Sequence, residues 1–225
     1  MRAAHKFVSL EQLDRGSQSG AHRPRPLAEC VPPGRLVELC GDAPTTAATA
    51  LLVAAQQSGE TCVWIQPARG ELYPPDLAAA GVDVEALIVV HIPDKANLPG
   101  PAGQCRAAEL LLRSGGFGLV ILDFAHAEPK GSSNAWQGRL LGLARQHEAR
   151  LLILRRAAPD SLPSLGPLVS LRIASRVERA VNESDPPGFR PRTGHFLVHH
   201  EVVKNKSGAP IEPSPETIRG PWGMC

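Results

Sequence analysis

The sequence predicts an α/β protein with a mostly parallel central sheet that is covered by helices on both faces. First, short apolar runs alternate with helical patterns from residue 35 to residue 154. Second, most of these runs are continuously apolar, which is typical of parallel strands buried on both faces. Third, the pattern changes after residue 165, where two strand-like runs follow each other and predict an antiparallel extension of the sheet.

The individual elements follow from these runs and from the glycines and prolines between them. The strand-like runs are 35–40, which alternates in polarity, and the more apolar 61–65, 87–90, 118–123, 150–154, 169–173 and 194–204. The helical patterns are 45–58, which Gly59 ends, then 75–80, 107–114 and 136–147. Residues 93–103 and 182–192 are predicted loops because they are rich in proline, glycine and polar residues.

A chain of 225 residues is long enough for one substantial core. We therefore predict one core domain over residues 34–210. Residues 1–33 are predicted to hold a short amphipathic helix (Phe7, Val8, Leu10 and Leu13) and a flexible linker, and residues 211–225 a flexible tail.

Charge and cysteine content exclude few functions. A formal net charge of +2 gives no general argument for nucleic-acid binding. The arginines between 139 and 192 are either a local basic face or solvated surface residues. Five cysteines without a CxxC spacing favour neither a disulfide framework nor a zinc site. Without an apolar leader or spanning segment, we expect a cytoplasmic protein with no membrane association.

A turn beginning with Gly41 separates the first strand from the first long helix, as a phosphate-binding loop would. The pattern G-x-x-x-x-G-K-[ST] then places Thr46 at the second glycine, Ala47 at the lysine and Ala48 at the magnesium-binding hydroxyl. The cation and the metal ligand are therefore missing, and Asp42 adds a negative charge. We expect no nucleotide hydrolysis and no bound cofactor at this position.

Other polar residues are weak candidates for chemistry. Asp123 ends an apolar strand where a magnesium-binding acid would stand, but its lysine and hydroxyl partners are absent, so we predict no catalytic residue. His199 and His200 are neighbours on one strand and point to opposite faces, which disfavours a shared metal. Trp64 and Trp136 are expected to pack in the core or against loops rather than to stack on a ligand.

Several segments resemble the RecA family in the same order along the chain. They are Pro33–Gly41, Gly59–Ile65, Ala80–Leu87, Arg113–Asp123 and, most specifically, Val-Val-Lys-Asn-Lys-Ser-Gly-Ala-Pro at 202–210. The resemblance covers about residues 33–210. A RecA-like chain with a degraded phosphate loop is most similar to the ImuA family, accessory proteins of damage-induced translesion synthesis. This resemblance implies RecA, the Y-family-polymerase-like ImuB and an error-prone polymerase as partners.

The departures from RecA shape what is expected of the site. Gln66-Pro-Ala-Arg69 replaces the segment with the catalytic glutamate, leaving only the displaced Glu71. Arg155 and Arg156 stand where RecA has a nucleotide-sensing glutamine, and we predict that they contact nucleic acid or a partner. The two DNA-binding loops are expected to be short, at about 130–135 and 157–165, so any DNA binding is weak or indirect.

In RecA the two lysines of the Lys-Asn-Lys segment reach the ATP of the neighbouring subunit. The resemblance therefore implies that Lys204, Asn205 and Lys206 form a partner-binding segment that caps an ATP-bound RecA filament end. The alternative is that both lysines are ordinary solvated residues on an edge strand.

Two further functions stay open from the sequence. One is a recombination mediator with weak or unorthodox ATPase activity and DNA binding, and the other is a cell-division inhibitor of the same superfamily. Self-association is also open.

Overall fold

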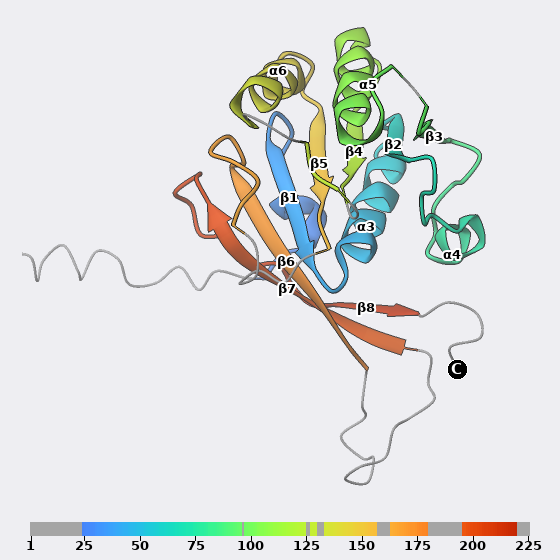
Figure 1. The fold of residues 1–225 in the computed structure, drawn as a ribbon. Helices are drawn as coiled ribbons and strands as arrows, with labels where there is room; N and C mark the ends of the chain where they lie inside the picture. Colours follow the sequence, from blue (N-terminus) through green and yellow to red (C-terminus); the bar gives the residue numbers. More distant parts are fainter. Residues whose placement is uncertain are drawn as a thin grey trace, which may run out of the picture.

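The computed structural model describes residues 24–95, 97–124, 127–129, 133–156, 163–179 and 195–219. Within these residues one sheet of eight strands has the order β3-β2-β4-β5-β1-β6-β7-β8 (Figure 1). The strands are β1 (Leu36–Gly41), β2 (Cys62–Pro67), β3 (Leu87–Ile92), β4 (Leu119–Asp123), β5 (Arg150–Leu154), β6 (Leu171–Arg179), β7 (His195–Asn205) and β8 (Glu216–Arg219). The six from β3 to β6 pair in parallel, and β7 and β8 pair antiparallel. The predicted fold class is confirmed.

Helices cover the parallel part of the sheet on two faces (Figure 1). On one face α2 (Leu27–Cys30) and α3 (Pro44–Gln57) pack in one apolar cluster, and α4 (Pro74–Ala79) adds Leu77 to it. On the other face α5 (Gly100–Ser114) and α6 (Ser133–Gln146) pack in a second cluster. Because side chains alternate along each strand, every parallel strand supplies apolar residues to one or both clusters.

The start of α5 differs from the sequence expectation. The sequence predicts a loop through residue 103, whereas the helix begins at Gly100 with a proline in its first turn. A Cβ at Gly103 would lie 2.0 Å from the Leu98 carbonyl oxygen and 2.7 Å from Ile92 Cγ2. This glycine therefore serves close packing inside a helix, which the sequence shows only as a loop signal.

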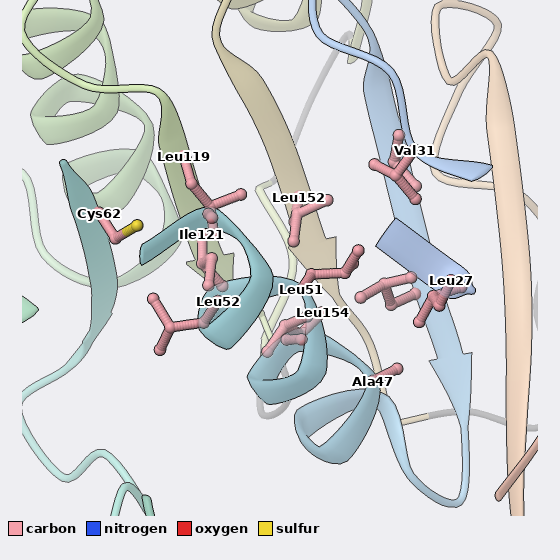
Figure 2. Packing of buried hydrophobic residues seen from close by; sticks show 14 of the residues in the cluster. Leu27, Val31, Ala47, Leu51, Leu52, Cys62, Leu119, Ile121, Leu152 and Leu154 are labelled. Carbon is pink, nitrogen blue, oxygen red and sulfur yellow. The ribbon is translucent and has the colours of Figure 1, made fainter. Parts of the chain in front are cut away.

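Two segments outside the predicted core are folded onto it. Leu27 and Val31, within the predicted linker, are fully buried in the α3-side cluster together with Ala47 and Leu51 (Figure 2). Within the predicted flexible tail, β8 pairs with β7 from Val198 to His195. The first segment packs on α3 and the second pairs with β7, and both contacts are long-range effects that local composition does not reveal. The domain boundaries themselves, and the amphipathic segment at 7–13, which lies outside the described residues, stay a prediction.

The first strand also differs from its predicted alternation, since every residue of β1 is buried. The acid of this strand, Glu38, has no exposed surface. Trp64 and Trp136 lie in the core as predicted, and Trp136 packs edge to face on Phe124 with ring centroids 6.0 Å apart. Cys30, Cys40, Cys62 and Cys105 are free thiols. Over the described part of the chain, no helix has the length and apolarity to span a membrane.

Candidate functional site

The turn after β1 is much shorter than a phosphate-binding loop. Only Asp42 and Ala43 separate β1 from α3, whose first turn contains Pro44. The amides of Asp42 and Ala43 both donate to the carbonyl oxygen of Ser175 on β6, at 3.0 and 3.2 Å. Pro44 has no amide hydrogen. Three successive backbone positions that could face a phosphate therefore offer no free donor.

Gly41 has a structural role in this turn. Its φ of +97° lies in the left-handed region. A Cβ built on it would lie 2.4 Å from the Ser175 carbonyl oxygen. The glycine thus allows β1 to turn tightly against β6, and the same carbonyl then accepts the next two amides.

Ala47 and Ala48, at the positions of the missing lysine and hydroxyl, are completely buried. They belong to the α3-side cluster, in which Leu27 and Leu52 are also found (Figure 2). A lysine at residue 47 would carry its charge into this cluster. The positions of the missing lysine and hydroxyl are therefore part of the apolar core.

Asp123 lies at the carboxyl end of β4 and is nearly buried. Its backbone carbonyl accepts a hydrogen bond of 2.7 Å from Gln104 Nε2, which also donates to the Ile65 carbonyl at 3.2 Å. Gln104 of α5 therefore ties the ends of β2 and β4 together. Gln66, which follows Ile65 on β2, is buried, and its Nε2 lies 3.4 Å from His91 Nε2.

A charged cluster is centred on Glu38, on the face of β1 opposite to α3. Glu38 Oε1 lies 2.7 Å from Arg155 Nη1 and 3.0 Å from Arg172 Nε. Both arginine side chains are at most 5% exposed. Arg155 also donates to Glu128 at 2.7 Å through its Nε. Two buried cations thus share one fully buried carboxylate, whose removal would leave both without their main counter-charge.

This cluster holds the segment between β5 and β6 in place. Glu38 Oε2 accepts hydrogen bonds from Leu165 N at 3.0 Å and from Ser164 Oγ at 3.2 Å. Arg155 Nη1 donates to the Pro163 carbonyl at 2.8 Å. We call Glu38, Arg155, Arg172, Lys204, Lys206 and the segment 163–167 the clamp.

The two lysines complete the clamp from β7 and the residue after it. Lys204 Nζ donates to Ser164 Oγ and to the Gly166 carbonyl, each at 3.1 Å. Lys206 Nζ donates to the Pro167 carbonyl, and its backbone amide donates to Ser170. Asn205 closes the following turn, since its Oδ1 accepts from Ser207 N at 2.9 Å. Lys204 and Lys206 are thus engaged within their own chain.

Electrostatics distinguish the members of the clamp. Burial lowers the pKa of Lys204, and the nearby Lys206 charge lowers it further. Burial also works to lower the pKa of Arg155, but its hydrogen bonds to Glu38 and Glu128 outweigh that effect and raise it. Arg155 is therefore charged in the folded protein, held by two carboxylates.

The structure brings only some of the predicted site residues together. Lys204, Lys206 and Arg155 meet at residues 163–167, whereas Arg156 is exposed and pairs with Glu71. A contact between Arg155 and a partner would require the clamp to open. Sequence reasoning missed Glu38; its only signal was one acid inside a strand that is otherwise apolar.

The two predicted DNA-binding loops, 130–135 and 157–165, are described only in part. The last three residues of the first belong to α6, which begins at Ser133, and residues 163–165 of the second are held in the clamp. His200 is buried, with Nδ1 2.9 Å from Ser175 Oγ, whereas His199 is exposed, as expected for neighbours on a strand. Among the residues that the structure describes, no group of three or more His, Cys, Asp or Glu side chains is arranged to hold a metal ion.

Comparison with known proteins identifies the fold of the chain. No protein-family model and no curated protein sequence matches the chain. Among solved structures, the crystal structure of the RadB recombinase matches with a TM-score of 0.54 and 16% sequence identity, over 84% of this chain and 88% of that chain. The strand order, the antiparallel extension and this match agree: the chain has a RecA-like fold.

Proposed function

We propose that this chain is a RecA-like accessory protein of DNA-damage-induced translesion synthesis that acts through binding, without hydrolysing nucleotide. The observation that carries the proposal is the closed turn after β1, where the Ser175 carbonyl takes the amides of Asp42 and Ala43. A recombinase needs these positions to hold a triphosphate. A RecA-like fold in which these positions are closed can still assemble with partners through its surfaces, but it cannot bind and hydrolyse ATP to drive that assembly.

Opening the turn for a triphosphate would cost several interactions at once. Both amides would leave Ser175, and Pro44 has no amide to offer. No cation stands at residue 47 to neutralise the phosphates, and the exposed Asp42 opposes them. Each lost backbone hydrogen bond costs about 1 kcal/mol, and an unneutralised polyphosphate adds more.

The lysine segment supports RecA as the partner. The resemblance to RecA assigns Lys204 and Lys206 to a neighbour's ATP, and Lys206 is exposed. In the free chain their ammonium groups donate to neutral acceptors of residues 164–167. A triphosphate is a stronger acceptor because charge-assisted hydrogen bonds exceed neutral ones. An ATP-bound RecA end would therefore draw these lysines out of the clamp.

The proposed partners are RecA, through the lysine segment, and a Y-family-polymerase-like protein of the ImuB kind together with an error-prone polymerase. Direct DNA binding is not required by this role. The resemblance to ImuA supports these partners, and the closed turn supports a role that does not consume ATP.

The decisive experiment measures binding of the purified chain to RecA with an ATP analogue, with ADP and without nucleotide, while nucleotide alone is titrated into the chain. We expect binding to RecA that depends on the ATP analogue, and no nucleotide binding by the chain itself. Tight ATP binding by the chain would contradict the proposal and favour an ATPase that acts as a recombination mediator.

Variants make this experiment specific. Changing Lys204 and Lys206 together to alanine should abolish the ATP-dependent part of RecA binding. Changing Lys95, another exposed lysine, to alanine is the matched control and should leave binding unchanged. Equal binding by both variants would exclude the lysine segment as the RecA contact.

A further inference from the structure

An apolar groove of about 540 Å³ lies between α3, the region of α4 and the antiparallel strands. Such a volume is typical of pockets that enclose a compact ligand. Most of its lining is apolar, including Val53, Leu72, Leu77, Val177, Phe196 and Ile218. None of the functions considered above uses this groove.

Three strands build one wall of the groove. Phe196 of β7 and Ile218 of β8 are direct cross-strand partners, so their side chains share a face of the sheet. Val177 of β6 lies on the same wall and is 37% exposed. Tyr73, on the opposite side before α4, is 61% exposed, a large fraction for an aromatic residue that lines a pocket.

The chain itself carries a side chain that suits this groove. Arg219 ends β8, and Gly220-Pro221-Trp222 follows at once. Trp222 is four residues beyond Ile218, a length of chain that spans at most about 14 Å. A Gly-Pro pair marks a turn, so the backbone can reverse and bring residue 222 back over the strand it has just left.

We propose that the groove is a docking site for residues 220–225 of the same chain, with the Trp222 indole as the anchor. The indole buries a large apolar area against Val177, Phe196 and Ile218. Its N–H needs an acceptor when buried, and the rim offers the Asp76 carboxylate and the Thr46 hydroxyl.

Docking also gives the groove a role beside the closed turn. Thr45 and Thr46 of the first turn of α3 line the groove, so a docked indole covers the surface next to the closed turn. The inference is independent of the proposed function, because it concerns only contacts within the chain.

Tryptophan fluorescence tests the docking, because the other two tryptophans, Trp64 and Trp136, are buried. Acrylamide quenching should be weak for the unchanged chain. Val177→Lys, which puts a charge into the groove from an exposed position, should create an easily quenched component, and Trp222→Ala in the same chain should remove it. Val203→Lys, at another exposed valine of the antiparallel strands that does not line the groove, is the matched control and should quench like the unchanged chain.

A second probe is the single tyrosine of the chain, Tyr73. With 3-fluorotyrosine incorporated, it gives one fluorine resonance whose position is sensitive to the ring current of a nearby indole. Trp222→Ala should shift this resonance, and it remains informative even if Val177→Lys does not fold.

Three results would overturn the inference. One is a strongly quenched Trp222 in the unchanged chain, and another is a fluorine resonance that Trp222→Ala does not move. The third is protection of Trp222 that disappears on dilution, because the tail would then occupy the groove of a second copy. Independence of concentration together with the shift supports docking within one chain.

Discussion

The two regions that the sequence resemblance aligns with the halves of a RecA nucleotide site differ sharply in how their polar groups are satisfied. At the turn after β1, backbone amides bond to one backbone carbonyl, and the side chains at 47 and 48 are buried alanines. At the clamp, on the other face of the sheet, charged side chains from four segments meet around the buried Glu38. The first region is neutral and joins the apolar core, whereas the second is charged.

This difference shows what each half can still do. In the turn after β1, the amides of Asp42 and Ala43 are satisfied by a backbone carbonyl and are not available to a ligand. A charged clamp depends on mutual pairing, because each buried charge is costly without its partner. Under the proposed function, the clamp is therefore the half expected to exchange an internal acceptor for one on a partner.

The largest effect is expected for Glu38→Ala. Arg155 and Arg172 would lose their shared buried carboxylate, and Leu165 N would lose its acceptor. Removing one partner of a buried pair lowers the free energy of unfolding by about 3–5 kcal/mol. Urea denaturation measures this change. Glu178→Gln, which breaks an exposed pair with His199, should change stability by less than about 1 kcal/mol, and equal losses would show that the clamp is not a buried charge network.

The closed turn is tested by Gly41→Ala. The new Cβ would meet the Ser175 carbonyl, and φ would remain unfavourable for alanine. Strain of this kind costs about 1–3 kcal/mol. Gly142→Ala, in the middle of α6 with open space around it, should instead stabilise the protein by about 0.5–1 kcal/mol. If Gly41→Ala left the thermal unfolding midpoint unchanged, the tight approach of β1 to β6 would be wrong.

Alanine substitutions of the two clamp lysines should lower the stability of the protein by different amounts. Lys204→Ala removes two hydrogen bonds from a half-buried ammonium, and we expect a loss of about 1–2 kcal/mol in urea denaturation. Lys206→Ala should change stability little, because its exposed ammonium exchanges one carbonyl for water. A larger loss of stability for Lys206→Ala than for Lys204→Ala would contradict the conclusion that Lys204 is the more buried of the two.

Ionisation of the buried thiols is expected to have the smallest effect on the free energy of unfolding at neutral pH. Its effect becomes measurable at alkaline pH. Burial raises the pKa of Cys62 to about 11 and that of Cys105 to about 12, from 9.0. Above pH 9 the unfolded chain loses these protons first, so the free energy of unfolding falls as pH rises.

The pKa of Lys204 is lowered in the folded protein, so the titration of Lys204 makes the free energy of unfolding rise with pH, opposite to the thiols. Urea midpoints from neutral pH to about pH 10.5 measure the slope. A Cys62→Ala, Cys105→Ala double variant should flatten it, and an unchanged slope would assign it to other groups.

Local pattern accounts for most of the fold. Continuous apolar runs predicted the parallel strands, and Gly59 and Gly115 end helices in the left-handed conformation. The start of α5 and the packing of Leu27 were missed, because Gly103 and Leu27 act through contacts with distant residues. At the site, the missing lysine at 47 was visible, whereas the partner of the amides at 42 and 43 lies on β6, more than a hundred residues away.

By itself, the sequence determined the α/β class, the order of elements and the loss of the phosphate-binding groups, because these depend on residue type and short-range spacing. Only the tertiary structure decided that the turn is closed, that Glu38 gathers two arginines, and that Lys204 and Lys206 hold residues 164–167. Those features depend on which strands lie side by side. Pairing β1 with β6 and β6 with β7 brings together residues whose sequence separation hides their chemistry.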